Sequence, residues 1–354
     1  MEDIDHTEIL FASFDTIAQL APPGKTVILV NTDLKQRAET LLGSSLEAQT
    51  FLKWIEVPEG EACKTLTAYR DVCTALLDCS ADRDTVIAAV GGGSTSDLAG
   101  FVAHTFMRGL RLIIVPTTLL AMVDASIGGK NAINLGNAKN AIGSFHFPSH
   151  MLCDVRWLQT LPSRDISSGM AEVIKHALID SESHVRMLEE LAGSGRPLTD
   201  LDEPTLTAMI RRSQEIKLRF IKSDPYDTGI RHALNYGHTF GHAIELVTGL
   251  PHGYAVAAGM GTINRFALER GIMNRRTYER VADLLHRFGL PASLEEACAL
   301  VPMPAPTAEI VSLLAADKKL HSGMIRLVLL HEIGTFSIEP VPLQELAAFA
   351  GVHA

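Results

Sequence analysis

The chain has 354 residues, of which 47% are hydrophobic and 20% charged, so it can bury a sizeable core and fits about two globular domains. Its 41 acidic residues against 31 basic ones give a formal charge of −10, which argues against broad binding to a nucleic-acid backbone. The longest apolar runs are strand-sized and far below the roughly 18 residues that a membrane span needs.

The cysteines and the N-terminal residues indicate where in the cell the protein is expected. The five cysteines are scattered, with no CxxC pair, as is typical of reduced thiols. The first residues are acidic and lack the basic and apolar segments of a signal peptide. We therefore expect a soluble, cytoplasmic protein.

Short β-branched runs in the first half predict a parallel α/β sheet. Residues 26–30 and 84–90 have the pattern of buried strands, and 112–115 that of a third. Between the second strand and an expected helix at 98–106 stand three glycines, 91–93, which would let backbone N–H groups approach a phosphate. They depart from the fingerprint G-x-G-x-x-G, and a purely structural turn fits the spacing equally well.

The pattern changes near residue 160. Amphipathic helices follow, separated by loops such as 193–197 and 302–306. We predict two domains, 1–160 and 161–354, packed around one cleft, the second mostly helical.

Three histidines lie within fifteen positions. His238 and His242 are four apart and share one helical face, a spacing that suits zinc, but the glutamate of HExxH is absent. His252 begins what reads as the next helix. Isolated histidines are usually surface or core groups, whereas this concentration favours a ligand site.

Glu172 and Lys175 lie three apart in a helix that is otherwise apolar. An ordinary surface ion pair is the simplest reading. However, the flanking Met170, Val173 and Ile174 predict that the pair is partly buried, where charges require a metal or substrate partner.

Basic residues also recur among glycine and alanine in this acidic chain. Each alone reads as a solvated charge, but together they predict a pocket for a small polyanion. They are Arg108, Lys130, Lys139, Lys217, Arg231 and the pair Lys318-Lys319.

Several ordered motifs together resemble the 3-dehydroquinate synthases and the wider sugar phosphate cyclases. The resemblance runs over about residues 26–335. It is carried by the glycines 91–93 with 97–101, and by 116–121, 123–130, 169–175 and 237–242. It implies an N-terminal Rossmann-like NAD-binding domain and a C-terminal helical metal-binding domain, with the active site between them, in a homodimer.

The resemblance also implies the roles of individual residues. Glu172, His238 and His252 would bind a divalent metal, zinc or cobalt, which places His242 on the phosphate side instead. Lys217 and Arg231 would hold a substrate carboxylate, and Lys175 would lie beside the metal. NAD would be bound by Asp33, Glu61, Lys64, Gly92, Gly93, Asp97, Thr117, Thr118, Asp124 and Lys139, with Thr160 and Leu161 at its adenosine end. The substrate phosphate would meet Lys130, Asn140, Asn235, His242 and Lys319 or Lys318, with Arg108 reaching in from the second subunit.

The implied substrate is 3-deoxy-D-arabino-heptulosonate 7-phosphate, a small sugar phosphate. In this chemistry the metal polarises a hydroxyl, NAD removes and later returns a hydride, phosphate is eliminated, and an aldol step closes the ring. The implied enzyme is a lyase, because phosphate is eliminated without net oxidation. The resemblance also implies that the substrate phosphate itself takes the proton, so no protein base is assigned.

The chain departs from the family pattern at three places. Ser94-Thr95-Ser96 follow the glycines, Tyr254 replaces a glutamate after His252-Gly253, and Lys35 stands where asparagine is common. The alternatives are an amino-dehydroquinate synthase, a cyclase acting on sedoheptulose 7-phosphate or glucose 6-phosphate, a metal-dependent alcohol dehydrogenase, or a degenerate binding protein. Lys217 and Arg231 favour a substrate with a carboxylate.

Overall fold

The structure is a computed structural model that describes residues 7–43, 51–136, 138–225, 227–302, 306–316 and 323–352. Its contacts divide the chain into two compact units. The first comprises Met1–Leu161 and Asp202–Ile210, and the second Pro162–Leu201 and Arg211–Ala354.

The first unit is built on a six-stranded sheet with the order β1-β8-β5-β4-β2-β3, in which every neighbouring pair is parallel. The strands are β1 (Glu8–Phe11), β2 (Thr26–Asn31), β3 (Phe51–Val57), β4 (Val86–Gly91), β5 (Arg111–Pro116) and β8 (His150–Cys153). The helices are α1 (Ile17–Leu20), α2 (Lys35–Leu42), α3 (Leu66–Asp78) and α4 (Gly93–Thr105). The strand order and the parallel pairing confirm the expected Rossmann-like architecture.

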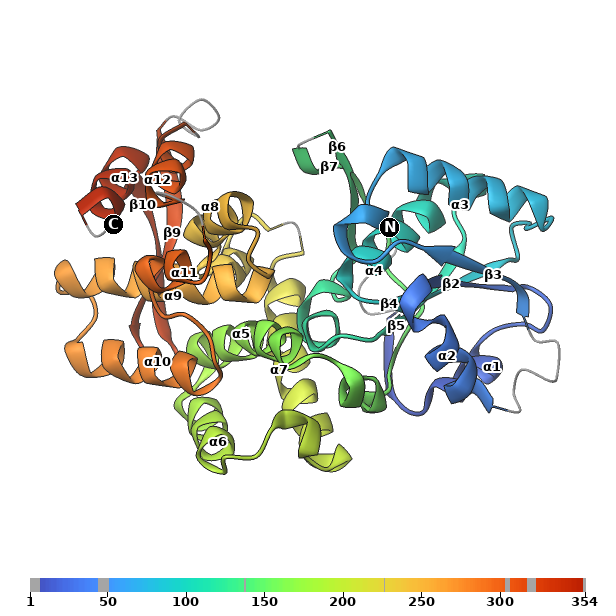
Figure 1. Ribbon diagram of the computed structural model, residues 1–354, viewed down its shortest axis with the longest axis horizontal. Coiled ribbons are helices and arrows are strands. Elements are labelled where there is room, and N and C mark those ends of the chain that lie inside the picture. The colour runs from blue at the N-terminus through green and yellow to red at the C-terminus, as the bar shows by residue number, and fades with distance from the viewer. Residues whose placement is uncertain are drawn as a thin grey trace. The chain divides into compact units, whose positions relative to one another are not determined.

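Helices cover both faces of this sheet. The chain passes from β2 to β3 in one direction and from β3 over to β4 in the other, so right-handed crossovers place α2 and α3 on opposite faces, as Figure 1 shows. Alternate strand residues such as Val27 and Leu29 pack against Val72 and Leu76 of α3. The buried runs predicted at 26–30, 84–90 and 112–115 correspond to β2, β4 and β5.

Two features of this unit differ from the sequence-based expectation. Helix α4 begins at Gly93 rather than residue 98, and takes in Ser94-Thr95-Ser96. Its first turn is fixed by long-range contacts, with the side chain of Thr95 hydrogen-bonded to that of Asn31 and Ser96 Oγ 3.1 Å from Ser126 Oγ. An antiparallel hairpin of β6 (Lys130–Leu135) and β7 (Ala138–Phe145) was not predicted, because glycine, alanine and asparagine give it little strand propensity.

The second unit is mostly helical, as expected. Its helices are α5 (Ser163–Asp180), α6 (Glu182–Gly193), the larger part of α7 (Glu203–Ser223), α8 (His238–Thr248), α9 (His252–Glu269), α10 (Arg275–Arg287), α11 (Leu294–Ala299), α12 (Pro306–Ala316) and α13 (Leu343–Val352). The strands β9 (Met324–Glu332) and β10 (Thr335–Pro342) pair as an antiparallel hairpin. Most of helix α9 is buried, and it contacts α5, α8, α10 and α11. Among the described helices, none has the length and apolarity to cross a membrane.

Candidate active site

Helix α5 carries a buried ion pair. Glu172 and Lys175 are 0% and 1% exposed, and the ammonium Nζ contacts Glu172 Oε2. The surrounding Met170, Val173 and Ile174 are fully buried, which confirms the burial expected from the sequence. Because an isolated buried carboxylate is costly, Glu172 requires cationic partners around it.

His238 is the first residue of helix α8. The preceding Gly237 has φ +81°, and a Cβ there would lie 2.7 Å from the carbonyl oxygen of Val256 in α9. Glycine is therefore needed both for the left-handed turn and for the close approach of the two helices. His238 Nδ1 donates to the carbonyl oxygen of Tyr236 at 3.2 Å, which leaves Nε2 with its lone pair.

His252 is the first residue of α9, as predicted. A Cβ on Gly253 would lie 1.9 Å from the carbonyl oxygen of Ser168, and Gly253 N–H donates to Ser168 Oγ at 3.0 Å. The start of α9 is thus pressed directly against α5. His252 Nδ1 lies 2.9 Å from Glu245 Oε2 and donates to it, so in the neutral ring Nε2 is the nitrogen with the lone pair.

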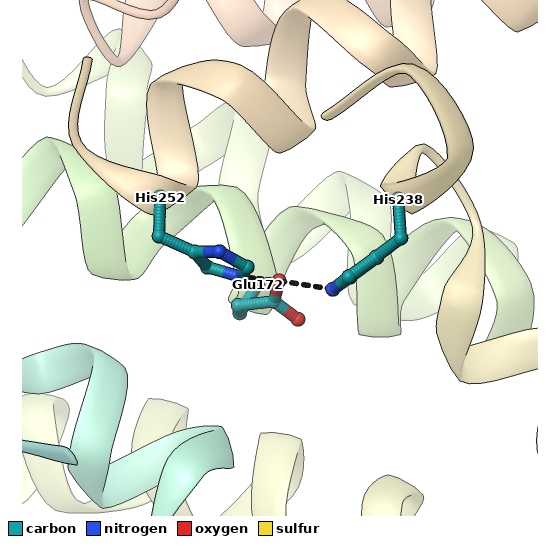
Figure 2. Close-up of side chains that lie close together, drawn as sticks. All are labelled: Glu172, His238 and His252. Carbon is teal, nitrogen blue, oxygen red and sulfur yellow. Dashed lines mark ion pairs between the residues drawn. The ribbon is translucent and has the colours of Figure 1, made fainter. Parts of the chain in front are cut away.

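Both imidazoles converge on one carboxylate oxygen. Nε2 of His238 lies 3.6 Å and Nε2 of His252 3.5 Å from Glu172 Oε1, and the two ion pairs are drawn in Figure 2. Tetrahedral zinc with bonds of about 2.0–2.1 Å separates neighbouring ligand atoms by roughly 3.4 Å. One carboxylate and two imidazoles, with ligand atoms within 4.8 Å of one another, therefore fit an open site for a divalent metal.

The two histidines have very different pKa values without a metal. Burial lowers the pKa of His238 to about 3, and the nearby Lys175 ammonium adds to this effect. Burial also opposes the charged form of His252, but the carboxylates of Glu172 and Glu245 outweigh it and raise its pKa to about 9. His238 is thus already in the neutral form that a metal ligand needs, whereas His252 must release a proton.

His242 lies one turn beyond His238 and next to a cavity. Its ring centroid is 5.4 Å from that of His238 and 6.5 Å from that of His252. A cavity of about 560 Å³ is lined by His242, His238 and Asn235, together with residues of α12 and β9. His238 and His242 thus lie on one face of α8. The metal-compatible cluster around His238, however, consists of Glu172, His238 and His252 and does not include His242.

Two basic side chains of this unit are buried. Lys217 in α7 is 8% exposed, and Arg231 in the short helix Ile230–Asn235 is 5% exposed. Arg231 Nη1 donates to the carbonyl oxygen of Pro225 at 2.8 Å, which helps to hold the guanidinium in place.

In the first unit, most residues assigned to NAD follow the carboxyl ends of parallel strands. Asp33 comes after β2, Glu61 and Lys64 after β3, Gly92, Gly93 and Asp97 after β4, and Thr117 and Thr118 after β5. The carboxyl edge of such a sheet is where open α/β proteins bind nucleotides. Asp124 lies farther on in the chain, in a π-helical turn at Ala121–Ala125.

Lys64 connects this edge with the unpredicted hairpin. It is 4% exposed, lies 2.6 Å from Asp97 Oδ2, and donates to the side chain of Asn140 in β7. Glu61 accepts from Asn134 Nδ2 of β6 at 2.7 Å. The structure thus brings residues assigned to NAD together with Asn140, which was assigned to phosphate, on the hairpin that also carries Lys130 and Lys139.

The remaining predicted site residues lie in separate parts of the chain. Arg108 lies in the turn before β5, at the amino edge of the sheet, with φ 71°. Thr160 ends the short helix Val155–Thr160, and Leu161 follows it. Lys318 and Lys319 lie outside the described residues.

The three departures from the family pattern have local partners. Lys35 Nζ lies 2.6 Å from Glu56, Ser94 Oγ donates to Glu61 at 3.3 Å, and the guanidinium of Arg164 lies 5.9 Å from the ring centre of Tyr254. The carboxylate that orients His252 comes from Glu245, which was not among the predicted site residues. The signal was present, because His238, His242 and Glu245 recur at i, i+4 and i+7 on one helical face.

Comparison with known proteins supports the resemblance over most of the chain. Residues 54–168 match the N-terminal and 169–320 the C-terminal model of 3-dehydroquinate synthase. A 3-dehydroquinate synthase of Geobacillus thermodenitrificans is 40% identical over 333 residues, covering 92% of this chain and 86% of the relative. One of Sulfolobus acidocaldarius is 38% identical over 300 residues, covering 84% and 83%.

Solved structures share the fold at lower identity. A 2-deoxy-scyllo-inosose synthase with carbaglucose-6-phosphate, NAD+ and Co2+ is 24% identical, with a TM-score of 0.82 and coverage of 97% and 95%. A 2-epi-5-epi-valiolone synthase of Streptomyces hygroscopicus with NAD+ and Zn2+ is 22% identical, with a TM-score of 0.83 and coverage of 98% and 97%. A butanol dehydrogenase of Thermotoga maritima is 15% identical, with a TM-score of 0.67 and coverage of 98% and 97%. With both halves matched by family models and with relatives at about 40% identity, this chain belongs to the 3-dehydroquinate synthase family of carbon–oxygen lyases.

Proposed function

We propose that this chain converts 3-deoxy-D-arabino-heptulosonate 7-phosphate into 3-dehydroquinate and phosphate, with NAD and a divalent metal as resident cofactors. The observation that carries the proposal is the convergence of two imidazole Nε2 atoms on Glu172 Oε1. A lyase of this family needs an open metal site, and three protein ligands leave coordination positions of the metal for substrate oxygens.

Glu172, His238 and His252 hold the metal, zinc or cobalt, the ions present in the two related cyclase structures. When bound, such an ion makes a substrate hydroxyl more acidic, and NAD accepts and returns a hydride. Lys175 keeps Glu172 Oε2 occupied, so Oε1 is the oxygen turned toward the histidines. The Nδ1 partners, Glu245 and the carbonyl of Tyr236, keep both Nε2 lone pairs aimed at the same point.

The substrate carboxylate is held by Lys217 and Arg231. Two buried cations are costly beside a neutral hydroxymethyl group and favourable beside a carboxylate. This argument favours the heptulosonate phosphate, or its amino analogue, over sedoheptulose 7-phosphate or glucose 6-phosphate. The backbone N–H of Arg231 donates to Asp224 Oδ2 at 3.1 Å, which fixes the backbone that carries this guanidinium.

The substrate phosphate meets Lys130, Asn140, Asn235, His242 and a lysine of the pair Lys318-Lys319. Converging N–H donors stabilise the dianion as it leaves, and the phosphate takes the proton itself. Arg108, at the amino edge of its own sheet, contributes from a second copy in a homodimer.

NAD is bound at the carboxyl edge of the sheet by the residues assigned to it, including Lys139, Thr160 and Leu161. Residues 1–160 form the NAD-binding domain, 161–354 the metal- and substrate-binding domain, and the enzyme works in the cytoplasm. Because hydride is removed and returned in one turnover, NADH does not accumulate and the absorbance at 340 nm stays constant.

A phosphate-release assay tests the proposal. Purified enzyme with NAD and zinc or cobalt is given the heptulosonate phosphate, its amino analogue, sedoheptulose 7-phosphate or glucose 6-phosphate, with absorbance followed at 340 nm. We expect phosphate from the heptulosonate phosphate without net NADH. Turnover of sedoheptulose 7-phosphate instead would make the substrate assignment wrong, and accumulating NADH would favour a dehydrogenase.

A further inference from the structure

One loop of the second unit, which includes the short helix Ile230–Asn235, carries both Arg231 and Asn235. Its first part is held by Asp224, whose carboxylate accepts from the backbone N–H groups of Thr228 at 3.0 Å, Gly229 at 2.6 Å and Arg231 at 3.1 Å. These bonds hold the pKa of the Asp224 carboxyl below its usual range. The backbone leading to Arg231 is therefore fixed by a local carboxylate.

The second part of the loop is attached to strand β9 through His232. Its Nε2 lies 3.0 Å from the carbonyl oxygen of Arg326, and Arg326 Nη1 donates to the carbonyl of Thr228 at 3.1 Å. The other ring nitrogen of His232, Nδ1, lies 3.1 Å from Asn235 Nδ2. One imidazole thus connects a strand with the Asn235 amide.

The carbonyl of Arg326 fixes the tautomer of this ring. A carbonyl oxygen only accepts, so Nε2 carries the hydrogen, and in the neutral ring Nδ1 is then an acceptor. The only side-chain group of Asn235 that can complement an acceptor is its NH₂. The Asn235 amide is therefore held with its nitrogen toward His232, leaving one N–H and the oxygen Oδ1 for other partners.

We infer that His232 is a positioning residue that sets the orientation of the Asn235 amide for the substrate. Both residues line the cavity that also borders His238 and His242. Held in this way, Asn235 offers one donor to a phosphate oxygen and one acceptor to a substrate hydroxyl. Without the Nδ1 acceptor the amide can rotate by 180° about its last bond and place Oδ1 where the donor is needed. The inference rests on the proposed function of Asn235 in binding substrate. The tautomer of His232 follows from its hydrogen bonds and does not depend on that function.

Two substitutions separate the bonds of His232. Asparagine places an amide oxygen near the position of Nδ1, so His232→Asn keeps the acceptor for Asn235 and loses the bond to Arg326. Glutamine reaches the position of Nε2, so His232→Gln keeps the donor to Arg326 and loses the acceptor. Since a typical hydrogen bond contributes about 0.5–1.5 kcal/mol net, we expect His232→Gln to raise KM for the heptulosonate phosphate roughly 3- to 10-fold with little change in kcat. His232→Asn should stay close to the wild type.

A double-mutant cycle tests whether the effect passes through Asn235. In an Asn235→Ala background, His232→Gln and His232→Asn should have the same KM. If His232→Gln and His232→Asn have equal KM values when Asn235 is present, the inference is overturned. It is also overturned if His232→Gln still raises KM in the Asn235→Ala background. Melting temperatures of both variants check that the loop remains folded.

A second readout does not depend on activity. Nitrogen-15 NMR of histidine-labelled enzyme, with His232→Asn identifying the resonance, should show the His232 ring protonated at Nε2. A ring protonated at Nδ1 contradicts the positioning role even if the enzyme is fully active. Conversely, an enzyme that releases phosphate from none of the sugar phosphates refutes the proposed function while the NMR result still decides the orientation of His232.

Discussion

Glu245 Oε2 accepts a hydrogen bond from His252 Nδ1 at 2.9 Å, and this contact turns the other nitrogen of the ring toward Glu172. The bond determines the tautomer of His252. It also places a negative charge behind the imidazole, which increases the basicity of Nε2. Metal affinity should therefore depend on Glu245, although Glu245 is not a ligand.

We expect Glu245→Ala to weaken metal binding about 10- to 100-fold, and Glu245→Gln to weaken it less because the amide oxygen still accepts from Nδ1. Competition with a chromophoric chelator measures the affinity. Glu279→Ala, at an exposed position of α10, is the matched control and should leave it unchanged. Equal affinity of the wild type and Glu245→Ala would show that His252 needs no carboxylate behind it.

Gly253→Ala should displace the start of α9. The added Cβ would lie 1.9 Å from the carbonyl oxygen of Ser168, and backbone atoms on both sides must move to relieve the overlap. Overpacking of this kind costs typically about 1–3 kcal/mol of unfolding free energy, and here it also moves His252. Thermal unfolding and chelator competition should both show losses. The control is Gly193→Ala, where a Cβ meets nothing within 4 Å.

His184 makes stability dependent on pH. The side chain is 2% exposed, and burial lowers its pKa from 6.5 to about 4. Between these values the unfolded chain binds a proton that the folded protein does not, so the unfolding free energy falls as the pH falls from 6.5 toward 4. The loss from this group reaches about 3 kcal/mol, and is absent above the unfolded pKa.

Urea unfolding at several pH values checks this prediction. His184→Leu removes the titrating group, so its stability should fall less steeply than that of the wild type between pH 6.5 and 4. Parallel curves for the two proteins would mean that His184 is protonated equally in the folded and unfolded states.

Lys217 and Arg231 should govern recognition of the carboxylate. Hydrogen bonds to charged groups contribute about 1.5–3 kcal/mol, so Lys217→Ala and Arg231→Ala should each raise KM for the heptulosonate phosphate by roughly 10- to 100-fold. Lys222→Ala, exposed on the same helix as Lys217, is the control. Steady-state kinetics measure the effect, and unchanged KM in both variants would remove the carboxylate role.

The fold was predictable where local pattern and tertiary environment agree. The strands β2, β4 and β5 are β-branched and buried on both faces, and Glu172 and Lys175 stand out as charges in an apolar helix. The early start of α4 was not predictable, since glycine, serine and threonine are poor helix formers and the partner of Thr95 is Asn31, more than sixty residues away.

For the candidate site, the sequence indicated which side chains could come together, but not the contacts that support them. The resemblance to the family implied Glu172, His238 and His252, and the fold brings these three side chains together from three helices. The links from Lys64 to Asn140 and from His232 to Arg326 join segments about 76 and 94 residues apart, and spacing along a sequence carries no information on such pairs. Glu245 could have been found by extending the i, i+4 pair of α8 by one more step.

The most direct test of the central claim is metal content measured together with phosphate release. The wild type, stripped with a chelator and reloaded, should bind one divalent ion per chain and regain phosphate release in proportion to it. Glu172→Gln should bind the ion far more weakly and remain inactive, while Glu279→Gln should behave as the wild type. Full phosphate release by the metal-free wild type, or stoichiometric metal in Glu172→Gln at the same affinity, would contradict the account.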